Sequence, residues 1–514
     1  MAAADSRRAP PSRPNWRRCN AELAFVLRER KESVKKDKPN IILVMCDDLG
    51  YGDTGFNGNE IIRTPGLDAM RSEGARFTRF FAGGPVSSPT RGTCLTGRHY
   101  SRYGVTHANE GRLPTEEITI ARVCREHGYR TGHFGKWHLG TLTTAIRDSN
   151  RGGPEHAQEF SPPWLHGFDV CFSAEAKVPT WDPMVVPDEK HPKGGHMWGE
   201  PGTPFNTHYW DQDGEIVRDN LEGDDSRVIM DRAVPFIREC SGHKTPFFAV
   251  IWFHTPHMPV VAGPAYRAMY AQYSEDEQHY YGCVTAMDEQ VGRLNRELRE
   301  LGIENDTMVW FCSDNGPEGG GDVSRNGRNC GVTGGLRGRK RSLFNGGIGV
   351  PALLKWPGHV KPATDWTVPC STLDYFPTVA EILGYTMPDN RPMDGISLLP
   401  FIRSDSQTRP RAIPYRFLEH KNGMFGSPTI GLIDHQWKFL TNLSNDGAED
   451  MLFDLDADMA ETADKVKEHP DIAAQMRQQV AEFIASCRLS HHGTDYPTPY
   501  TPINTFQEIT GTWK

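Results

Sequence analysis

Three continuous apolar segments constrain the fold of this chain more than any other feature. They are NIILVMC at 40–46, FFAVIWF at 247–253 and MVWFC at 308–312. None of them alternates apolar with polar residues, so each predicts a strand that is buried on both faces. Helical patterns lie between them, at 118–129 and at 276–302. Because strands alternate with helices, we expect an α/β fold with a large, mainly parallel sheet flanked by helices.

The 514-residue chain is long enough for more than one domain. We predict a polar N-terminal extension over 1–38 and a main domain over 39–405, with an insertion from about 141 to 230. Short strand patterns and a helix from about 470 to 487 predict a smaller C-terminal α+β domain over 406–490 that carries an antiparallel sheet. The Pro- and Thr-rich residues 491–514 are predicted to form a tail.

The composition of the chain limits which kinds of binding partner and cellular location are expected. The net charge of −9 argues against general nucleic-acid binding. No apolar run approaches the roughly 20 residues that a membrane-spanning helix needs. The run LAFVL at 23–27 is too short for the core of a signal peptide, so no export signal is visible. The 11 cysteines include no CxxC pair and indicate no disulfide framework, which leaves the compartment open.

Two pairs of oxygen-bearing side chains follow predicted strands directly. Asp47 and Asp48 follow the first strand, and Asp314 and Asn315 follow the third. Ligands of parallel sheets collect at the carboxyl ends of the strands, and adjacent carboxylates repel one another unless a cation is present. Oxygen ligands without clustered Cys or His favour Ca²⁺ over Zn²⁺. The alternative is that these are ordinary turn residues, since Asp and Asn are common in turns.

The stretch SSPTRGTCLTGR at 87–98 combines a hydroxyl with a helix start. Pro89 disfavours the α conformation at Ser88, so the helix is expected to begin afterwards, with Ser87 just before it. The first N–H groups of a helix attract an anion, and Arg91 adds a full positive charge. The segment therefore predicts an anion site that contains a hydroxyl. An ordinary capped turn is the alternative.

Three further segments carry cationic or titratable side chains. GKWHLG at 135–140 contains Lys136 and His138, and HTPHMP at 254–259 contains His257. LRGRKRSLFNGGIGVP begins at 336 and contains Lys340. A histidine after a strand could donate a proton to a leaving group, and cations beside glycines could hold an anion. Each segment by itself could equally be a structural loop.

The order of these segments is more specific than any one of them. DDLGYGD, SSPTRGTCLTGR, GKWHLG, PHMP, SDNG and LRGRK together resemble the sulfatase family of the alkaline-phosphatase-like superfamily, over roughly residues 39–470. In that family the first residue of a C/S-x-P-S/T-R signature is oxidised to formylglycine, and that position here is Ser87. A serine there implies a radical-type bacterial maturase as a partner, and hence a bacterial glycan sulfatase. A Cys-to-Ser replacement that stops turnover is the alternative.

The resemblance also implies a role for each residue of the site. The implied Ca²⁺ ligands are Asp47, Asp48, Ser87, Asp314 and Asn315. The implied catalytic residues are Ser87, Arg91, His138, His257 and Asp314, and the implied sulfate-binding residues are Lys136, His257 and Lys340. Arg91 and His138 would orient the aldehyde hydrate at position 87, and His257 would protonate the leaving alcohol. The chain departs from the family pattern at Asn345, where Glu is usual, and at Gly349, where Arg is usual.

The predicted function is hydrolysis of sulfate esters on a carbohydrate. Aromatic residues in the predicted insertion could form a wall for a sugar ring, although core packing is an equal alternative. These candidates are Trp181, His208, Tyr209 and Trp210. The alternative functions are a phosphoester hydrolase that uses an unmodified Ser87 and a silent protein that binds sulfated glycans. The family resemblance implies a periplasmic or secreted location.

Overall fold

The computed structural model describes residues 38–191, 194–319, 328–403, 408–418, 427–443, 447, 449–497, 500, 502 and 504–506. The chain divides into two compact units, Met1–Pro39 and Asn40–Lys514, and the second is described below. Apart from Lys38, the predicted N-terminal extension lies outside the described residues, as does the end of the predicted tail at 507–514.

The three apolar segments lie side by side at the centre of a ten-stranded sheet, which confirms the predicted fold class. They form β1 (Asn40–Cys46), β10 (Phe247–Trp252) and β11 (Thr307–Ser313). β1 is parallel to β10 on one side and to β11 on the other. Across the sheet the order is β13-β2-β12-β11-β1-β10-β4-β7-β8-β9. The other strands are β2 (Ala75–Phe77), β4 (Arg130–Lys136), β7 (Val170–Ala174), β8 (Tyr209–Trp210), β9 (Ile216–Val217), β12 (Ala352–Lys355) and β13 (Thr364–Trp366).

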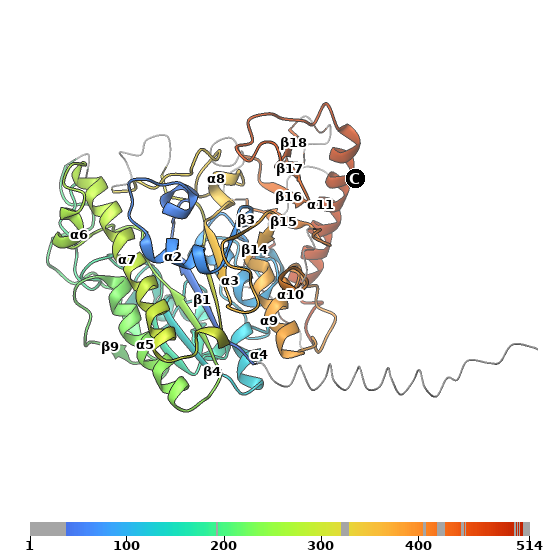
Figure 1. The fold of residues 1–514 in the computed structure, drawn as a ribbon. Coiled ribbons are helices and arrows are strands. Elements are labelled where there is room, and N and C mark those ends of the chain that lie inside the picture. The colour runs from blue at the N-terminus through green and yellow to red at the C-terminus, as the bar shows by residue number, and fades with distance from the viewer. Residues whose placement is uncertain are drawn as a thin grey trace, which may run out of the picture. The chain divides into compact units, whose positions relative to one another are not determined.

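Helices cover both faces of this sheet (Figure 1). Alternate residues of a strand point to opposite faces, and both sets are apolar in β1. Ile41, Leu43 and Met45 pack with α3 (Ser87–Thr96), α4 (Ile120–Glu126) and α9 (Tyr375–Leu383). Ile42 and Val44 pack with α2 (Pro65–Glu73), α5 (Asp225–Gly242) and α7 (Glu275–Glu300). The continuous apolar pattern therefore has a direct cause, because both faces of the central strands are in the core.

The edges of the sheet differ from its parallel centre. β12 runs antiparallel to β11, and β2 runs antiparallel to β12, so one side of the sheet is mixed. On the other side, residues that were predicted to be an insertion supply three strands. β7 is parallel to β4, and the short β8 and β9 follow in antiparallel order. Short parts of this segment thus belong to the main sheet.

A separate antiparallel sheet lies near the C-terminus, as predicted. Its order is β15-β16-β17-β18, and α11 (Pro470–His491) packs against it through a shared apolar cluster. Its strands are β15 (Ile413–Arg416), β16 (Ile430–Asp434), β17 (Trp437–Thr441) and β18 (Met451–Asp454). The remaining strands and α-helices of the described residues are β3 (Phe80–Phe81), β5 (Arg147–Asp148), β6 (Arg151–Gly152), β14 (Cys370–Ser371), α6 (Pro264–Ala268), α8 (Asn345–Ile348) and α10 (Leu399–Arg403). Within the described ranges, no helix has both the length and the apolar character to cross a membrane.

Candidate active site

The carboxyl ends of β1 and β11 bring the two predicted carboxylate pairs together. The Asp314 amide donates to the carbonyl of Cys46, so the pairing of the two strands continues one residue beyond the sheet. The Asp48 amide donates to Asp314 Oδ1 at 3.1 Å, and Asn315 Nδ2 donates to Asp48 Oδ1 at 2.7 Å. Parallel strands end at the same edge of a sheet, which is why residues about 270 positions apart meet here.

Ser87 is the first residue of α3, one turn before Arg91. Its hydroxyl donates to Asp47 Oδ1 at 3.1 Å, and the side chain is 1% exposed. Arg91 is fully buried and its guanidinium donates to Asp314 Oδ2 at 2.7 Å. The expected helix start after Ser88 was wrong. Pro89 stands in the first turn, where its missing N–H removes no helical hydrogen bond, and the bias against α conformation before proline is outweighed.

Lys136 and His138 enter the site from the end of β4. Lys136 Nζ lies 2.6 Å from Asp47 Oδ2 and 3.3 Å from the Ser87 hydroxyl. The backbone of His138 turns with a φ of 59°, and its amide donates to the carbonyl of Glu175, just beyond β7. Its Nε2 lies 2.8 Å from Asn109 Oδ1, an oxygen that can only accept, so Nε2 carries the hydrogen.

His257 and Lys340 complete the ring of predicted residues. His257 Nδ1 donates to the carbonyl of Met258 at 2.7 Å, which leaves Nε2 3.8 Å from Asp48 Oδ2. Lys340 Nζ lies 2.7 Å from Asp48 and 3.3 Å from Glu318. The structure therefore brings together the ten residues that the resemblance assigned to metal binding, catalysis and sulfate binding. They are Asp47, Asp48, Ser87, Arg91, Lys136, His138, His257, Asp314, Asn315 and Lys340.

Burial perturbs the titration of these groups strongly. Burial, together with Asp47 and Glu318, raises the pKa of Asp48 to about 7 although Lys340 opposes the shift. Burial and Asp47 also raise the pKa of Asp314. Burial alone would raise the pKa of Asp47, but the positive charges around it, Lys136 foremost, hold that pKa well below its ordinary value. Burial is thus the main reason why the charged forms of Asp48 and Asp314 are unfavourable in this site.

The donor set fits a hard divalent cation. Asp47, Asp48 and His257 each offer one potential ligand atom, and these three atoms lie within 4.8 Å of one another. Asn315 Oδ1 is buried and has no hydrogen-bond partner among the described residues. An unpartnered buried oxygen beside crowded carboxylates matches the oxygen-rich coordination of Ca²⁺. Asp47, Asp48, Asp314 and Asn315 are the residues that would hold it.

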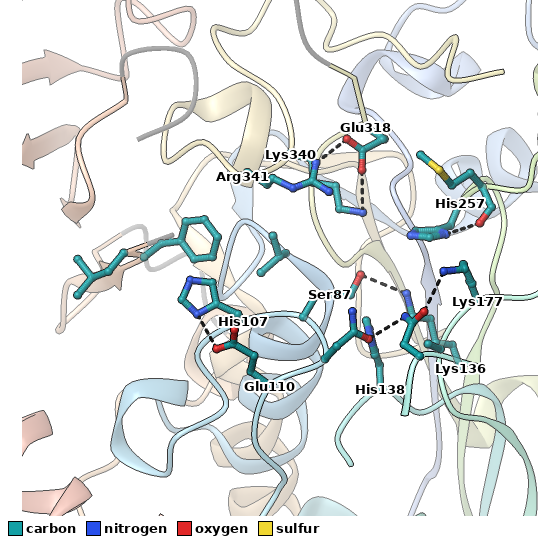
Figure 2. A pocket seen from close by; sticks show the side chains of 18 of the residues that line it. Ser87, His107, Glu110, Lys136, His138, Lys177, His257, Glu318, Lys340 and Arg341 are labelled. Atoms are coloured by element: carbon teal, nitrogen blue, oxygen red, sulfur yellow. Dashed lines mark hydrogen bonds and ion pairs between the residues drawn. The ribbon is translucent and has the colours of Figure 1, made fainter. Parts of the chain in front are cut away.

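A cavity of about 500 Å³ opens over Ser87, Lys136, His138, His257 and Lys340 (Figure 2). Its outer lining includes residues that the sequence analysis missed. They are His107, Asn109, Glu110, Asn150, Lys177, Trp198, Glu318, Arg341 and Phe417. Glu318 follows the SDNG segment closely and could have been found there. Arg341 directly follows Lys340 in the segment that begins at 336, and the remaining residues come from other parts of the chain whose proximity no local pattern indicates.

The proposed aromatic wall does not line this cavity. Tyr209 is fully buried in β8 and stacks on Phe172 with ring centroids 4.0 Å apart. Trp210 is also buried and donates to Asp148 at 2.8 Å. Core packing, the alternative interpretation, accounts for both. Trp181 and His208 are likewise not among the described residues that line the cavity, which takes its aromatic side chains from Trp198, Phe417 and His107 instead.

The fold and the site together define an enzyme that hydrolyses esters of an oxyanion, because a hydroxyl at a helix start is surrounded by fixed cations beside a carboxylate cluster suited to a divalent cation. A family model described as Sulfatase matches residues 39–385. A second, described as N-sulphoglucosamine sulphohydrolase, C-terminal, matches residues 338–486. The chain belongs to the sulfatase family of sulfuric ester hydrolases.

Curated relatives and solved structures agree with this assignment. Steryl-sulfatase of Mus musculus is 31% identical over 421 residues, which are 72% of this chain and 66% of that protein. Arylsulfatase G of Mus musculus is 32% identical over 429 residues, 78% of this chain and 76% of that protein. A crystal structure described as Ps i-CgsB in complex with k-i-k-neocarrahexaose has a TM-score of 0.71 and 27% identity, and the match covers 87% of this chain and 92% of that one.

Proposed function

We propose that this protein is an O-sulfatase that hydrolyses sulfate esters on a sulfated carbohydrate. One observation carries the proposal: the Ser87 hydroxyl lies at the start of α3, 3.1 Å from Asp47 and 3.3 Å from the Lys136 ammonium. A nucleophile in this position can be activated by a carboxylate-bound cation on one side and faces an anion-binding ammonium on the other.

Activation of Ser87 requires a modification, because a plain serine hydroxyl is a poor nucleophile. A maturase that removes a pair of hydrogens from the Ser87 side chain would convert it to formylglycine, whose hydrate supplies a better nucleophile. Ca²⁺ bound by Asp47, Asp48, Asp314 and Asn315 would lower the pKa of that hydrate. Serine at this position supports the radical-type bacterial maturase that the sequence analysis expects.

The remaining residues would bind, orient and protonate. Lys136 and Lys340 place two ammonium groups beside the carboxylates, where they would attract the sulfate oxygens of the ester. Fixed donors of this kind contribute about 3 to 4 kcal/mol each to stabilisation of a transition state. Because Nδ1 of His257 is engaged with the Met258 carbonyl, Nε2 is the nitrogen available to protonate the leaving alcohol.

The carbohydrate part of the proposal is supported by the cavity and by a relative. Trp198, Phe417 and His107 supply rings to a cavity whose lining also carries many polar side chains, a combination that suits sugar rings with hydroxyls. The structure described as Ps i-CgsB contains k-i-k-neocarrahexaose, and it shares 27% identity with this chain. Sulfated polysaccharides are extracellular polymers, so we also propose a periplasmic or secreted location.

Mass spectrometry and parallel assays test this function. Peptides spanning Ser87 are analysed after co-expression with a radical-type maturase, and loss of a pair of hydrogens is expected. The modified protein is then assayed on 4-nitrophenyl sulfate, 4-nitrophenyl phosphate and a panel of sulfated oligosaccharides. Turnover of sulfate esters only in the modified protein supports the proposal. Phosphate turnover by unmodified Ser87, or glycan binding without any turnover by the modified protein, contradicts it.

A further inference from the structure

Lys177 is a cavity cation that the chemistry proposed above does not use. It lies three residues after the end of β7, at the edge of the sheet where the site is built. The segment is fixed in place, because the amide of His138 donates to the carbonyl of Glu175 and Val178 is fully buried. In Figure 2 the labelled Lys177 lies on the same side of Ser87 as Lys136, whereas His107 and Glu110 lie on the other side.

Lys177 has no carboxylate in direct contact among the described residues. Its one polar contact among the described residues is a hydrogen bond of 2.9 Å to Asn150 Oδ1, a neutral amide. The other cavity lysines differ, since Lys136 pairs with Asp47 at 2.6 Å and Lys340 pairs with Asp48 at 2.7 Å. Glu175 is near in sequence but pairs with Arg151 at 2.8 Å.

Burial makes this imbalance unfavourable in the free protein. Burial, and repulsion from Lys136, lower the pKa of Lys177, although attraction to the more distant Glu175 opposes the shift. A partly buried ammonium beside a second ammonium is costly unless an anion neutralises it. The cavity therefore offers a second, unused position for a negative charge, close to the position that the sulfate ester would take.

Neutral amides hold Lys177 in place and connect it to the catalytic residues. Asn150 accepts from Lys177 and donates through Nδ2 to Asn109 Oδ1 at 2.8 Å. The same Asn109 oxygen accepts from His138 Nε2 at 2.8 Å. An anion on Lys177 would therefore lie at the end of a chain of hydrogen bonds that also fixes the ring of His138.

We propose that Lys177, oriented by Asn150, binds a second sulfate group of the substrate, next to the sulfate ester that is cleaved. This inference rests on the proposed function and narrows its substrate to glycans that carry two neighbouring sulfate groups. Lys177 is a specificity-determining residue, because it distinguishes doubly charged from singly charged sugars without contacting the reacting atoms.

Binding to the unmodified Ser87 protein tests the proposal without turnover. The probes are three matched pairs: the neocarrabiose units with one and with two sulfates, glucosamine 6-sulfate and its 2-N,6-O-disulfate, and N-acetylgalactosamine 4-sulfate and its 4,6-disulfate. Calorimetry is expected to show that at least one disulfated sugar binds about tenfold or more tightly than its monosulfated partner, the gain typical of a charge-assisted hydrogen bond. The proposal is wrong if no disulfated member is preferred by more than about threefold.

Variants separate a recognition role from a structural one. Lys177→Met is expected to abolish the preference while it changes the affinity for monosulfated sugars by less than about threefold, and Lys177→Arg is expected to keep most of the preference. Lys361→Met removes an exposed lysine outside the cavity and should change neither value. Equal losses for both members of a pair would overturn the proposal. Turnover of 4-nitrophenyl sulfate by the modified Lys177→Met protein reports separately on the sulfatase function, which can fail independently.

Discussion

Glu461 and Lys438 form a buried ion pair whose disruption gives the most quantitative prediction. Both side chains are fully buried, and Lys438 Nζ lies 2.7 Å from Glu461 Oε1. Glu461 also accepts from the amide of Asn345, and Lys438 donates to Asn345 Oδ1 at 2.7 Å. Burial raises the pKa of Glu461 and lowers that of Lys438, so each charge depends on the other.

The change Glu461→Ala removes the carboxylate and leaves a buried ammonium without its counter-charge. Breaking one partner of a buried pair costs about 3 to 5 kcal/mol, and the Asn345 amide loses its acceptor as well. We therefore expect the free energy of unfolding, measured by urea denaturation with circular dichroism, to fall by about 3 to 5 kcal/mol. Asn345 begins α8, next to the loop that carries Lys340, so sulfatase activity should fall too.

A double variant that lacks both charges is the control for the loss of stability in Glu461→Ala. Lys438→Met combined with Glu461→Leu removes both charges, so it should be more stable than Glu461→Ala by at least about 2 kcal/mol. The reasoning is refuted if Glu461→Ala unfolds within about 1 kcal/mol of the parent protein, or if the double variant is as unstable as the sum of its two single changes.

Three further predictions concern chemistry, metal and pH. His257→Ala should lower kcat for sugar sulfates by about 100- to 10,000-fold but much less for 4-nitrophenyl sulfate, whose leaving group needs no proton, as steady-state kinetics would show. Removal of Ca²⁺ with EGTA should abolish activity and lower the thermal unfolding midpoint, and added Ca²⁺ should restore both. Burial and the neighbouring Asp225 raise the pKa of Asp224 to about 8. The folded protein thus keeps a proton that the unfolded chain releases above about pH 4, and stability should fall between about pH 4 and pH 8. This decrease in stability, measured as the urea midpoint at each pH, should be smaller in Asp224→Asn.

The centre of the fold and the floor of the site, meaning the buried charged residues around Ser87, could be predicted from the sequence. Local apolar patterns and the topology of a parallel sheet determine where they lie. A strand buried on both faces must be continuously apolar, and β1, β10 and β11 have that pattern. Parallel strands end at one edge, so Asp47 and Asp314 had to approach one another. The family resemblance supplied the rest of the floor, including Lys136 and Lys340, which no single pattern identified.

Features that depend on pairing between distant segments could not be predicted. Tyr209 and Trp210 looked suited to sugar binding, but the pairing of β8 with β7 places them in the core. Lys177 became visible as a cavity residue only once β7 was seen beside β4. Position 345 carries Asn where the family usually has Glu. The carboxylate of Glu461, more than 100 positions away in the sequence, accepts a hydrogen bond from the Asn345 amide instead.

The buried charged residues of the floor differ from the loop residues at the rim of the cavity. This difference indicates how substrate specificity can change without loss of the hydrolytic reaction. The floor residues are tied by main-chain contacts that extend the sheet, such as the Asp47 amide to the Thr255 carbonyl and the Asp314 amide to the Cys46 carbonyl, each at 3.0 Å. A substitution there disturbs a fixed charge that catalysis needs before substrate arrives. Rim residues such as Lys177, Trp198 and Phe417 come from connecting loops, which tolerate exchange. Under the proposed function, such rim residues would select the sugar while the buried charged residues carry out the reaction.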